Sequence, residues 1–423
     1  MELTDHLFRH EAGRMVAVLT RIFGVHNLAL AEDVVQDAFC RALEVWSFRD
    51  VPENPSAWLM TAAKNRALDV LRREKTARTY EPELSRWLQS EWTLASEVEE
   101  MFSDTAIKDD QLRMMFSCCH PQLPEEAQVM LMLHILCGFG IHEVASAFVT
   151  TYTAVEKRIP RAKKVLAGSK RLFDTQAPSD FSNRLPAVQR ALYLLFNEGY
   201  HGASAEFAVR ADLCDEAMRL AKLLLEHPLG ATPSSYALSA LMCLNKSRLS
   251  ARVDASGKLN SLFDQDRSLW DQKLIGEGLR LLELSAQGSE LTEYHVEAGI
   301  AAVHATSPTM DATNWQEIVS LYDSLMTIRP TPIVALNRAI AVGQRDGADC
   351  GLHELRTIPD SDRLAKYPFY YAAIAEFELQ KGRSENAIEL FETAIKLARN
   401  HMEQQFFETR IASCHANMRA DQI

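Results

Sequence analysis

Three short motifs carry residue types that bind metals or transfer protons. The first, "SCCHP" (residues 117–121), sets two cysteines beside a histidine, and zinc prefers thiolate and imidazole ligands. Adjacent cysteines do not easily share one tetrahedral ion, and the chain has no cysteines spaced as C-x-x-C. We therefore predict no metal site, and interpret the motif as buried thiols followed by a helix-ending His-Pro.

The other two motifs lie further along the chain. "FNEGYHG" (196–202) holds an acid, a tyrosine and a histidine, and "FDQDRSLWD" (263–271) sets acids around Arg267. Neither is accompanied by a nucleophile–base pair, a phosphate-binding glycine loop or a metal-ligand set. The first is interpreted as a turn between helices and the second as a buried acid–arginine network, with a ligand or peptide site as the alternative. We predict no catalytic residue, no cofactor and no enzymatic activity.

A fourth stretch, "TAVEKRIPRAKKVLAG" (153–168), points to nucleic acid. The whole chain has a formal net charge of −12, yet residues 128–173 carry seven Lys and Arg against two Asp and Glu. A basic block of this kind is the electrostatic footprint of a DNA-binding face, although solvated helix surfaces are also commonly charged. Pro160 interrupts the segment and is expected to kink it.

The composition is that of a folded chain of two to three domains. Of the 423 residues, 47% are apolar and 24% are charged. No apolar run is long enough to span a bilayer, and the N-terminus lacks the pattern of a signal peptide. The eight cysteines are scattered, which favours reduced thiols. A cytoplasmic location is expected.

Apolar residues recur at spacings of three and four throughout, which predicts an all-α fold. Residues 29–46 and 53–74 read as two amphipathic helices, and periodicity is weak over 79–112, where acids accumulate. From Pro124 a helix runs to a stop at Gly138, and a short helix, a turn and a basic helix starting at Thr153 then predict a helix-turn-helix. Thr153 and Glu156 fit a capping box.

The last part of the chain, 188–423, reads as a long helical array. Ala339 aligns with Ala373 at an offset of 34, and Gly347 aligns with Gly382 at an offset of 35. This period is typical of tetratricopeptide-like repeats, which present a concave groove for binding.

The chain resembles the extracytoplasmic-function (ECF) group of bacterial RNA polymerase sigma factors. "AEDVVQDAFCRALEVW" and "AWLMTAAKNRALDVLRRE" resemble sigma region 2, and the segment from "LPEEAQVMLM" to "AKKVL" resembles region 4. "DDQLRMMFSCCHPQL", "ALYLLFNEGYHGAS", "FDQDRSLWD" and "TPIVALNRAIAV" resemble a subgroup with a fused tetratricopeptide-like extension. The resemblance implies a region 2 helical bundle, a region 4 helix-turn-helix and a C-terminal repeat array that regulates in cis.

The resemblance also implies site residues and partners. Binding to the clamp helices of the beta-prime subunit in polymerase core is expected from Asp33, Gln36, Asp37 and Arg41. Reading and opening of the −10 element is expected from Trp58, Lys64, Asn65, Arg66, Asp69, Arg72 and Arg73. Reading of the −35 element is expected from Thr153, Lys157, Arg158, Arg161 and Lys164.

The expected boundaries follow from these segments: region 2 at 1–80, an acidic linker at 81–112, region 4 at 113–173, a linker at 174–187 and the regulatory array at 188–423. Promoter DNA and polymerase core are the expected partners. A peptide, a protein or another part of the chain is the expected occupant of the repeat groove, and no membrane is involved. Two alternatives stay open: a helix-turn-helix regulator acting without core polymerase, and a protein-interaction adaptor.

Overall fold

The structure is a computed structural model, and the chain forms two compact units, Met1–Leu195 and Phe196–Ile423. It describes residues 2–48, 51–74, 100–148, 150–169, 172–175, 177–201, 209–254 and 259–420. The expected all-α fold is confirmed, because every element in these ranges is helical apart from one isolated bridge between Val253 and Leu259. None of the helices described is long and apolar enough to cross a bilayer.

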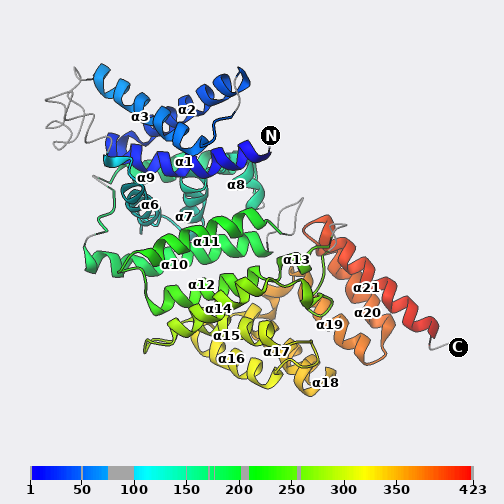
Figure 1. The fold of residues 1–423 in the computed structure, drawn as a ribbon. Helices are drawn as coiled ribbons and strands as arrows, with labels where there is room; N and C mark the ends of the chain where they lie inside the picture. Colours follow the sequence, from blue (N-terminus) through cyan, green and yellow to red (C-terminus); the bar gives the residue numbers. More distant parts are fainter. Residues whose placement is uncertain are drawn as a thin grey trace. The chain divides into compact units, whose positions relative to one another are not determined.

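The first unit contains both helical blocks that the sequence analysis singled out (Figure 1). The first block is the segment expected at 1–80, and the second block is the segment expected at 113–173. The helices of the first unit are α1 (Glu2–Phe23), η1 (Val25–Asn27), α2 (Leu28–Phe48), α3 (Pro55–Glu74), α6 (Asp104–Cys118), α7 (Glu125–Leu131), the π-helical segment η2 (Met132–Leu136), α8 (Ile141–Ala147), α9 (Tyr152–Ala167) and the start of α10 (Pro178–His201).

Helix α1 holds this unit together. It packs against α2 and α3 on one side and against α6 and η2 on the other (Figure 1). Met15, Val18, Leu19 and Ile22 are all buried, so the two helical blocks share one hydrophobic core. Backbones approach closely here: a Cβ added at Gly13 would lie 1.9 Å from the carbonyl oxygen of Leu136.

Local signals set several of the helix ends. Ser103 caps α6, its side chain accepting a hydrogen bond from the Ala106 N–H. Helix α7 and η2 end just before Gly138, which has a φ of 67°, a left-handed conformation that glycine adopts without steric cost. The stop predicted at Gly138 is therefore found.

Two segments expected to be linkers contain helix. Residues 104–112 form most of α6, because Ser103 caps a helix whose apolar side chains pack on α1. Residues 178–187 begin α10, where Phe181 packs on Phe116 and Arg184 donates hydrogen bonds to the carbonyls of Phe116 and Cys119. Residues 81–99 lie outside the described part of the chain.

The "SCCHP" motif is a buried helix end. Helix α6 ends at Cys118, and both Cys118 and Cys119 are fully buried. Burial raises the pKa of the Cys119 thiol to about 12. These thiols are therefore protonated near neutral pH and pack as small apolar side chains.

The second unit is a succession of helices that pack mainly on their neighbours in sequence (Figure 1). They are the end of α10, α11 (Ala211–Glu226), α12 (Pro233–Lys246), α13 (Leu249–Arg252), η3 (Arg267–Leu269), α14 (Gln272–Ser285), α15 (Glu293–Thr306), α16 (Trp315–Ile328), α17 (Pro332–Asp346), α18 (Ala348–Arg356), η4 (Ser361–Leu364), α19 (Pro368–Gln380), α20 (Ser384–Leu397) and α21 (His401–Ala420).

The two aligned glycines occupy equivalent turns. Gly347 joins α17 to α18 with a φ of 97°, and Gly382 joins α19 to α20 with a φ of 74°. Such positive φ values strain other residues, which explains why both positions carry glycine. Ala339 and Ala373 are likewise both buried between helices.

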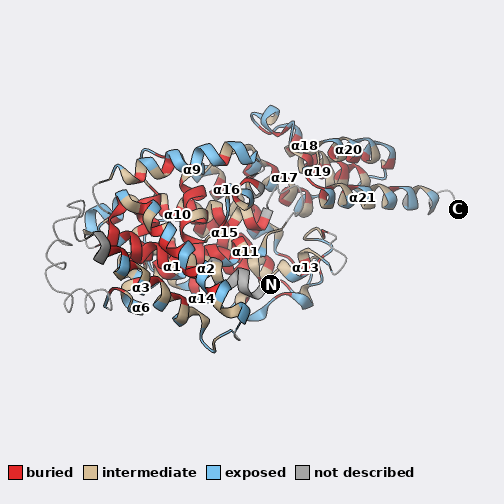
Figure 2. Ribbon diagram, turned by 90° about the horizontal axis from the view of Figure 1, so that it is seen from above, coloured by how far each residue is buried: buried red, intermediate tan, exposed pale blue. Residues whose placement is uncertain are grey.

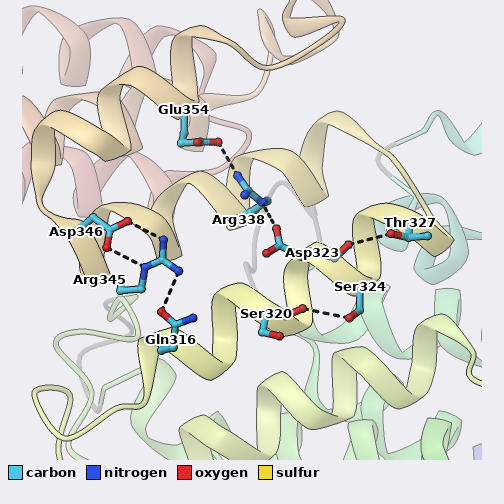
Figure 3. A network of polar contacts seen from close by, with 9 residues as sticks. All are labelled: Gln316, Ser320, Asp323, Ser324, Thr327, Arg338, Arg345, Asp346 and Glu354. Atoms are coloured by element: carbon cyan, nitrogen blue, oxygen red, sulfur yellow. Dashed lines mark hydrogen bonds and ion pairs between the residues drawn. The ribbon is translucent and has the colours of Figure 1, made fainter.

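Polar side chains also tie successive helices of this unit together (Figure 3). The Arg338 guanidinium on α17 donates to Asp323 of α16 at 2.6 Å and to Glu354 of α18 at 2.5 Å. Arg345 pairs with Asp346 and reaches Gln316 at 3.1 Å. The cations on this surface are therefore largely neutralised within the array.

Candidate nucleic-acid interface

The exposed face of α2 gathers the residues expected to bind polymerase. Asp33, Gln36, Asp37 and Arg41 are all exposed. Their spacing of three and four residues puts them on one stripe of the helix. The opposite face is buried and includes Val34, Ala38 and Ala42, so the helix is fixed against the core while this polar stripe faces outward.

An ion pair connects this stripe to α3. The Arg66 Nε lies 2.8 Å from the Asp37 Oδ2, with 37% and 53% of the two side chains exposed. Exposed pairs of this kind contribute at most about 1 kcal/mol to stability. The pair matters more for its position, because it joins a residue expected to bind polymerase to one expected to read the −10 element.

Aromatic side chains pack where α2 and α3 meet. Trp58, at the start of α3, is half-buried, and its ring makes an edge contact with Trp46 at a centroid distance of 5.5 Å. Trp46 in turn contacts Phe8 of α1. Beyond this cluster, α2 ends at Phe48, whose side chain is 90% exposed.

The remaining residues expected at the −10 element lie along α3. Asn65 and Asp69 are exposed, and Lys64 is half-buried. Arg72 and Arg73 fall in the last turns of α3, but their side chains lie outside the described residues. The residues expected at the −10 element therefore all lie on α3, from Trp58 near its start to Arg73 near its end.

Helices α7, α8 and α9 come next in the chain, and α9 packs against both α7 and α8. The predicted start of the basic helix at Thr153 is wrong. Helix α9 begins at Tyr152, and its N-cap is Thr151, whose hydroxyl oxygen accepts a hydrogen bond from the Ala154 N–H. Thr151 has the extended backbone that an N-cap requires, which leaves Thr153 inside the first turn with its side chain exposed.

Helix α9 separates apolar and basic residues cleanly. Val155, Ile159, Ala162 and Leu166 are buried. Figure 2 shows exposed residues along its outer side, and the basic ones among them are Lys157, Arg158, Arg161 and Lys164. Pro160 lies on the exposed side, and the helix continues through it to Ala167. The proline therefore leaves the buried stripe in place.

Only one of the four exposed cations on α9 has an ion-pair partner among the described residues. Arg158 lies 2.7 Å from Glu126 of α7. Lys157, Arg161 and Lys164 make no such pair within the described ranges. Their charges are available to an external anion such as a phosphate.

The inner side of α9 binds the first helical block directly. The Lys163 Nζ lies 2.6 Å from Glu32 on α2 and 2.9 Å from the His134 Nε2 on η2. The His134 Nδ1 donates to the carbonyl of Phe139 at 2.9 Å, so its Nε2 accepts from Lys163. Burial, and then the Lys163 charge, lower the pKa of His134, which keeps the ring neutral.

A second polar contact joins the blocks at the last turn of α1. Arg21 lies 3.3 Å from Asp110 of α6, a fully buried carboxyl group. Burial raises the pKa of Asp110 to about 7, against the opposing effect of Arg21. The two blocks are thus joined by an apolar core, by close backbone contact at Gly13 and by these two polar contacts.

Comparison with known proteins identifies the first block. Residues 7–77 match the model for sigma-70 region 2, and residues 184–286 match a family of unknown function, DUF6596. Across 94% of its length the chain is 37% identical to the uncharacterized protein R00370 of Rhizobium meliloti (strain 1021), covering 92% of that protein. The chain belongs to the family of this protein and carries a sigma-70 region 2.

A further relative agrees with this assignment. The ECF RNA polymerase sigma factor SigK of Mycobacterium ulcerans (strain Agy99) is 26% identical over 163 residues, which are 38% of this chain and 81% of that protein. Together with the region 2 match, this likeness supports a sigma factor. A sigma factor is a transcription initiation factor and not an enzyme.

Within sigma-70 region 2, the sequence patterns located the exposed stripe of α2 and the polar side of α3. They missed Gly13, Glu32 and Arg21, through which this region contacts the helices of the second block. Glu32 and Lys163 are separated by 131 residues, and nothing in their local sequence marks them as partners. Their contact follows only from the packing of α2, η2 and α9.

The exposed face of α9 leads to a salt-dependence prediction. Replacing Arg161 by alanine should weaken binding of promoter DNA by core polymerase carrying the variant. It should also reduce the slope of log affinity against log salt by about 0.9, the effect of one lost phosphate contact. Fluorescence anisotropy over a range of salt concentrations measures both. The control Lys396→Ala removes the same charge from an exposed position on α20 and should leave the salt slope unchanged. Equal salt slopes for the two variants would contradict the assignment of α9 to DNA.

Proposed function

We propose that the chain is an ECF-type sigma factor that binds RNA polymerase core and directs promoter recognition and opening. The observation that carries the proposal is the sigma-70 region 2 at 7–77, whose α2 presents Asp33, Gln36, Asp37 and Arg41 on one exposed stripe. Helix α3, which is paired to this stripe through Arg66, would read the −10 element. The protein would act in the cytoplasm, where its partners are.

In the proposed mechanism, residues 113–173 act as region 4. Helix α9 would enter the −35 element with Thr153, Lys157, Arg158, Arg161 and Lys164, all of which are exposed. Cationic side chains without internal partners favour this role, because released counterions drive binding to the DNA backbone. Base reading would then come from residues in the first turns of the helix.

In this proposal, the two promoter-reading parts would have to separate on the promoter. The −10 and −35 positions are roughly 25 base pairs, or about 85 Å, apart at about 3.4 Å per pair. In the compact unit, α2 and α9 are in direct contact through Glu32 and Lys163. Five residues of helix separate Glu32 from Asp37, about 7.5 Å, and Asp37 binds Arg66. The two reading surfaces are therefore much too close to occupy both elements at once.

The second unit, in this proposal, is a tetratricopeptide-like array that modulates activity in cis. The equivalent turns at Gly347 and Gly382 and the buried Ala339 and Ala373 support a repeat. Its groove would take a peptide, a protein or another part of the chain. Any truncation that tests this role should keep residues 178–195, since α10 belongs to the core of the first unit through Phe181 and Arg184.

The test is co-purification of the full chain with polymerase core, followed by run-off transcription. The expected result is a stoichiometric complex that initiates from a promoter that core polymerase alone does not use. Promoter binding by the free chain with no capture of core would instead indicate a helix-turn-helix regulator. Capture of core without any promoter-specific transcript would indicate an adaptor.

A further inference from the structure

In the second unit, arginines from two segments face buried aromatic rings. The Arg248 guanidinium, just before α13, lies 5.7 Å from the ring centre of Tyr200 and 5.9 Å from that of Trp270. The Arg267 guanidinium of η3 lies 4.9 Å from the Trp270 ring. Trp270 is only 3% exposed. Two cationic groups thus face one buried indole.

Arg267 is fixed in place by backbone carbonyls. Its guanidinium donates to the carbonyl oxygens of His304, in the last turn of α15, and of Ser307, just beyond that helix. It also contacts the Thr313 hydroxyl at 3.4 Å. These neutral acceptors hold the side chain but do not neutralise its charge. Arg267 therefore links η3 to the end of α15 through hydrogen bonds. Within the described chain, no carboxylate takes part in the hydrogen bonds of its guanidinium.

The two charged side chains that face the Trp270 ring are both guanidinium groups. Burial and then the Arg248 charge lower the pKa of Arg267. Burial, Arg248 and Arg267 together lower the pKa of His304 to about 3, so this imidazole is neutral near pH 7. Bringing two guanidinium groups together in a partly buried site is unfavourable unless an anion compensates them.

Several buried nitrogen atoms of the cluster have no hydrogen-bond partner among the described residues. They are the Arg248 Nε, the Trp270 Nε1 and the His304 Nδ1. Arg248 uses one other nitrogen to bond Asn245 at 2.6 Å. Trp270 and His304 are 3% and 7% exposed. Buried donors are nearly always satisfied in native proteins, and three of them beside two guanidinium groups favour an anionic acceptor.

We propose that Arg248, Trp270 and His304, with the charge of Arg267, form a binding site for a phosphate group. A phosphate dianion matches the charge of two guanidinium groups, whereas a carboxylate would neutralise only one. Its oxygens accept hydrogen bonds from guanidinium, indole and imidazole N–H groups alike. Arg248, Arg267 and Trp270 all lie within residues 184–286, the match to the family of unknown function, to which the site assigns a ligand chemistry. The residues of the site lie outside the sigma-70 region 2 match at 7–77, so phosphate binding can be tested apart from the proposed sigma function.

Inorganic phosphate is the probe that tests the site on the full chain. Calorimetric titration and thermal unfolding are recorded at constant ionic strength with three anions. Phosphate is the test anion, chloride replaces it in the reference sample, and acetate represents a carboxylate. Phosphate should bind with a dissociation constant on the order of 1 mM or lower and raise the unfolding temperature, as binding to the native state requires. Acetate should bind at least tenfold more weakly.

Two variants assign the binding to these residues. Arg248→Met keeps the length of the side chain, and Trp270→Phe keeps an aromatic ring while removing the N–H. Each should weaken phosphate binding at least tenfold while circular dichroism shows an unchanged helical content. Arg280→Met removes an exposed arginine of α14 that is paired with Glu277, and it should bind phosphate as the natural chain does.

Three results would overturn the proposal. They are equal phosphate binding by Arg248→Met and Arg280→Met, equal binding of acetate and phosphate by the natural chain, and a phosphate effect no larger than that of chloride.

Discussion

Asp37→Arg is expected to reduce the affinity for RNA polymerase core at least about thirtyfold. The side chain is half exposed on the α2 stripe, and reversing a charge inside an interface commonly costs about 2–5 kcal/mol. Since about 1.4 kcal/mol corresponds to a factor of ten, the loss should be evident in a co-purification assay and measurable by surface binding. Glu389→Arg, an exposed residue of α20, makes the same charge change in the other unit and should bind core normally.

The ion pair with Arg66 offers a sharper control for Asp37. The double variant Asp37→Arg with Arg66→Asp rebuilds the pair between α2 and α3 in the opposite orientation. If Asp37 contacts polymerase, the double variant should remain defective, because the charge presented by α2 is still reversed. Recovery of binding would mean that Asp37 acts only through its ion pair between α2 and α3. Asp33→Arg changes the same stripe without changing either partner of the ion pair. Weaker binding of core by this variant would therefore indicate a surface role of α2 that is independent of the pair.

Gly13→Ala should lower the stability of the first unit by about 3 kcal/mol. The added methyl group would lie 1.9 Å from the Leu136 carbonyl oxygen, so α1 and η2 must move apart, and overpacking of a tight core commonly costs about 1–3 kcal/mol. Hydrogen exchange should show faster exchange in α1 and in residues 132–136. Chemical unfolding of the full chain measures the loss.

Gly276→Ala provides the matched control, because a Cβ at this position in α14 meets no atom within 4 Å. Replacing a helical glycine by alanine at such a site should stabilise the chain by about 0.5–1 kcal/mol. The two variants therefore make the same chemical change with opposite expected signs. Equal stability of the two would show that contact at Gly13 does not hold the two helical blocks together.

The closed arrangement of the first unit bears on regulation of the proposed sigma factor. If α3 and α9 read the two promoter elements as proposed, the contacts that join α9 to α2, chiefly those of Lys163 with Glu32 and His134, would have to break before both elements are bound. Polymerase core, which would bind the exposed stripe of α2, is then the natural agent of opening. Gly13→Ala weakens the same closed state from the side of α1, without changing any residue assigned to polymerase or DNA.

Helix positions and faces were predictable because they depend on neighbouring residues. Spacings of three and four located α2, α3 and α9 and their exposed sides, and Gly138 marked a stop. The cap of α9 was misplaced by two residues, since Thr151 and Thr153 are both suitable caps and only the backbone of Thr151 is extended. The kink expected at Pro160 did not divide α9, because the proline faces outward and the buried stripe of the helix remains intact.

The sequence by itself determined an all-helical chain with a sigma-like first block, a basic helix and a glycine-punctuated array. The sigma-like character of the first block rests on its resemblance to sigma region 2, whereas amphipathic periodicity decides the helices residue by residue and says which face of a helix is apolar. It does not say which other helix will cover that face. The tertiary structure alone decided that Glu32 meets Lys163, that Arg21 meets Asp110 and that arginines from separate segments gather around Trp270. The contacts of Glu32 with Lys163, of Arg21 with Asp110 and of Arg248 with Trp270 join separate helices or segments. They form only when the packing of whole helices brings these residues within reach.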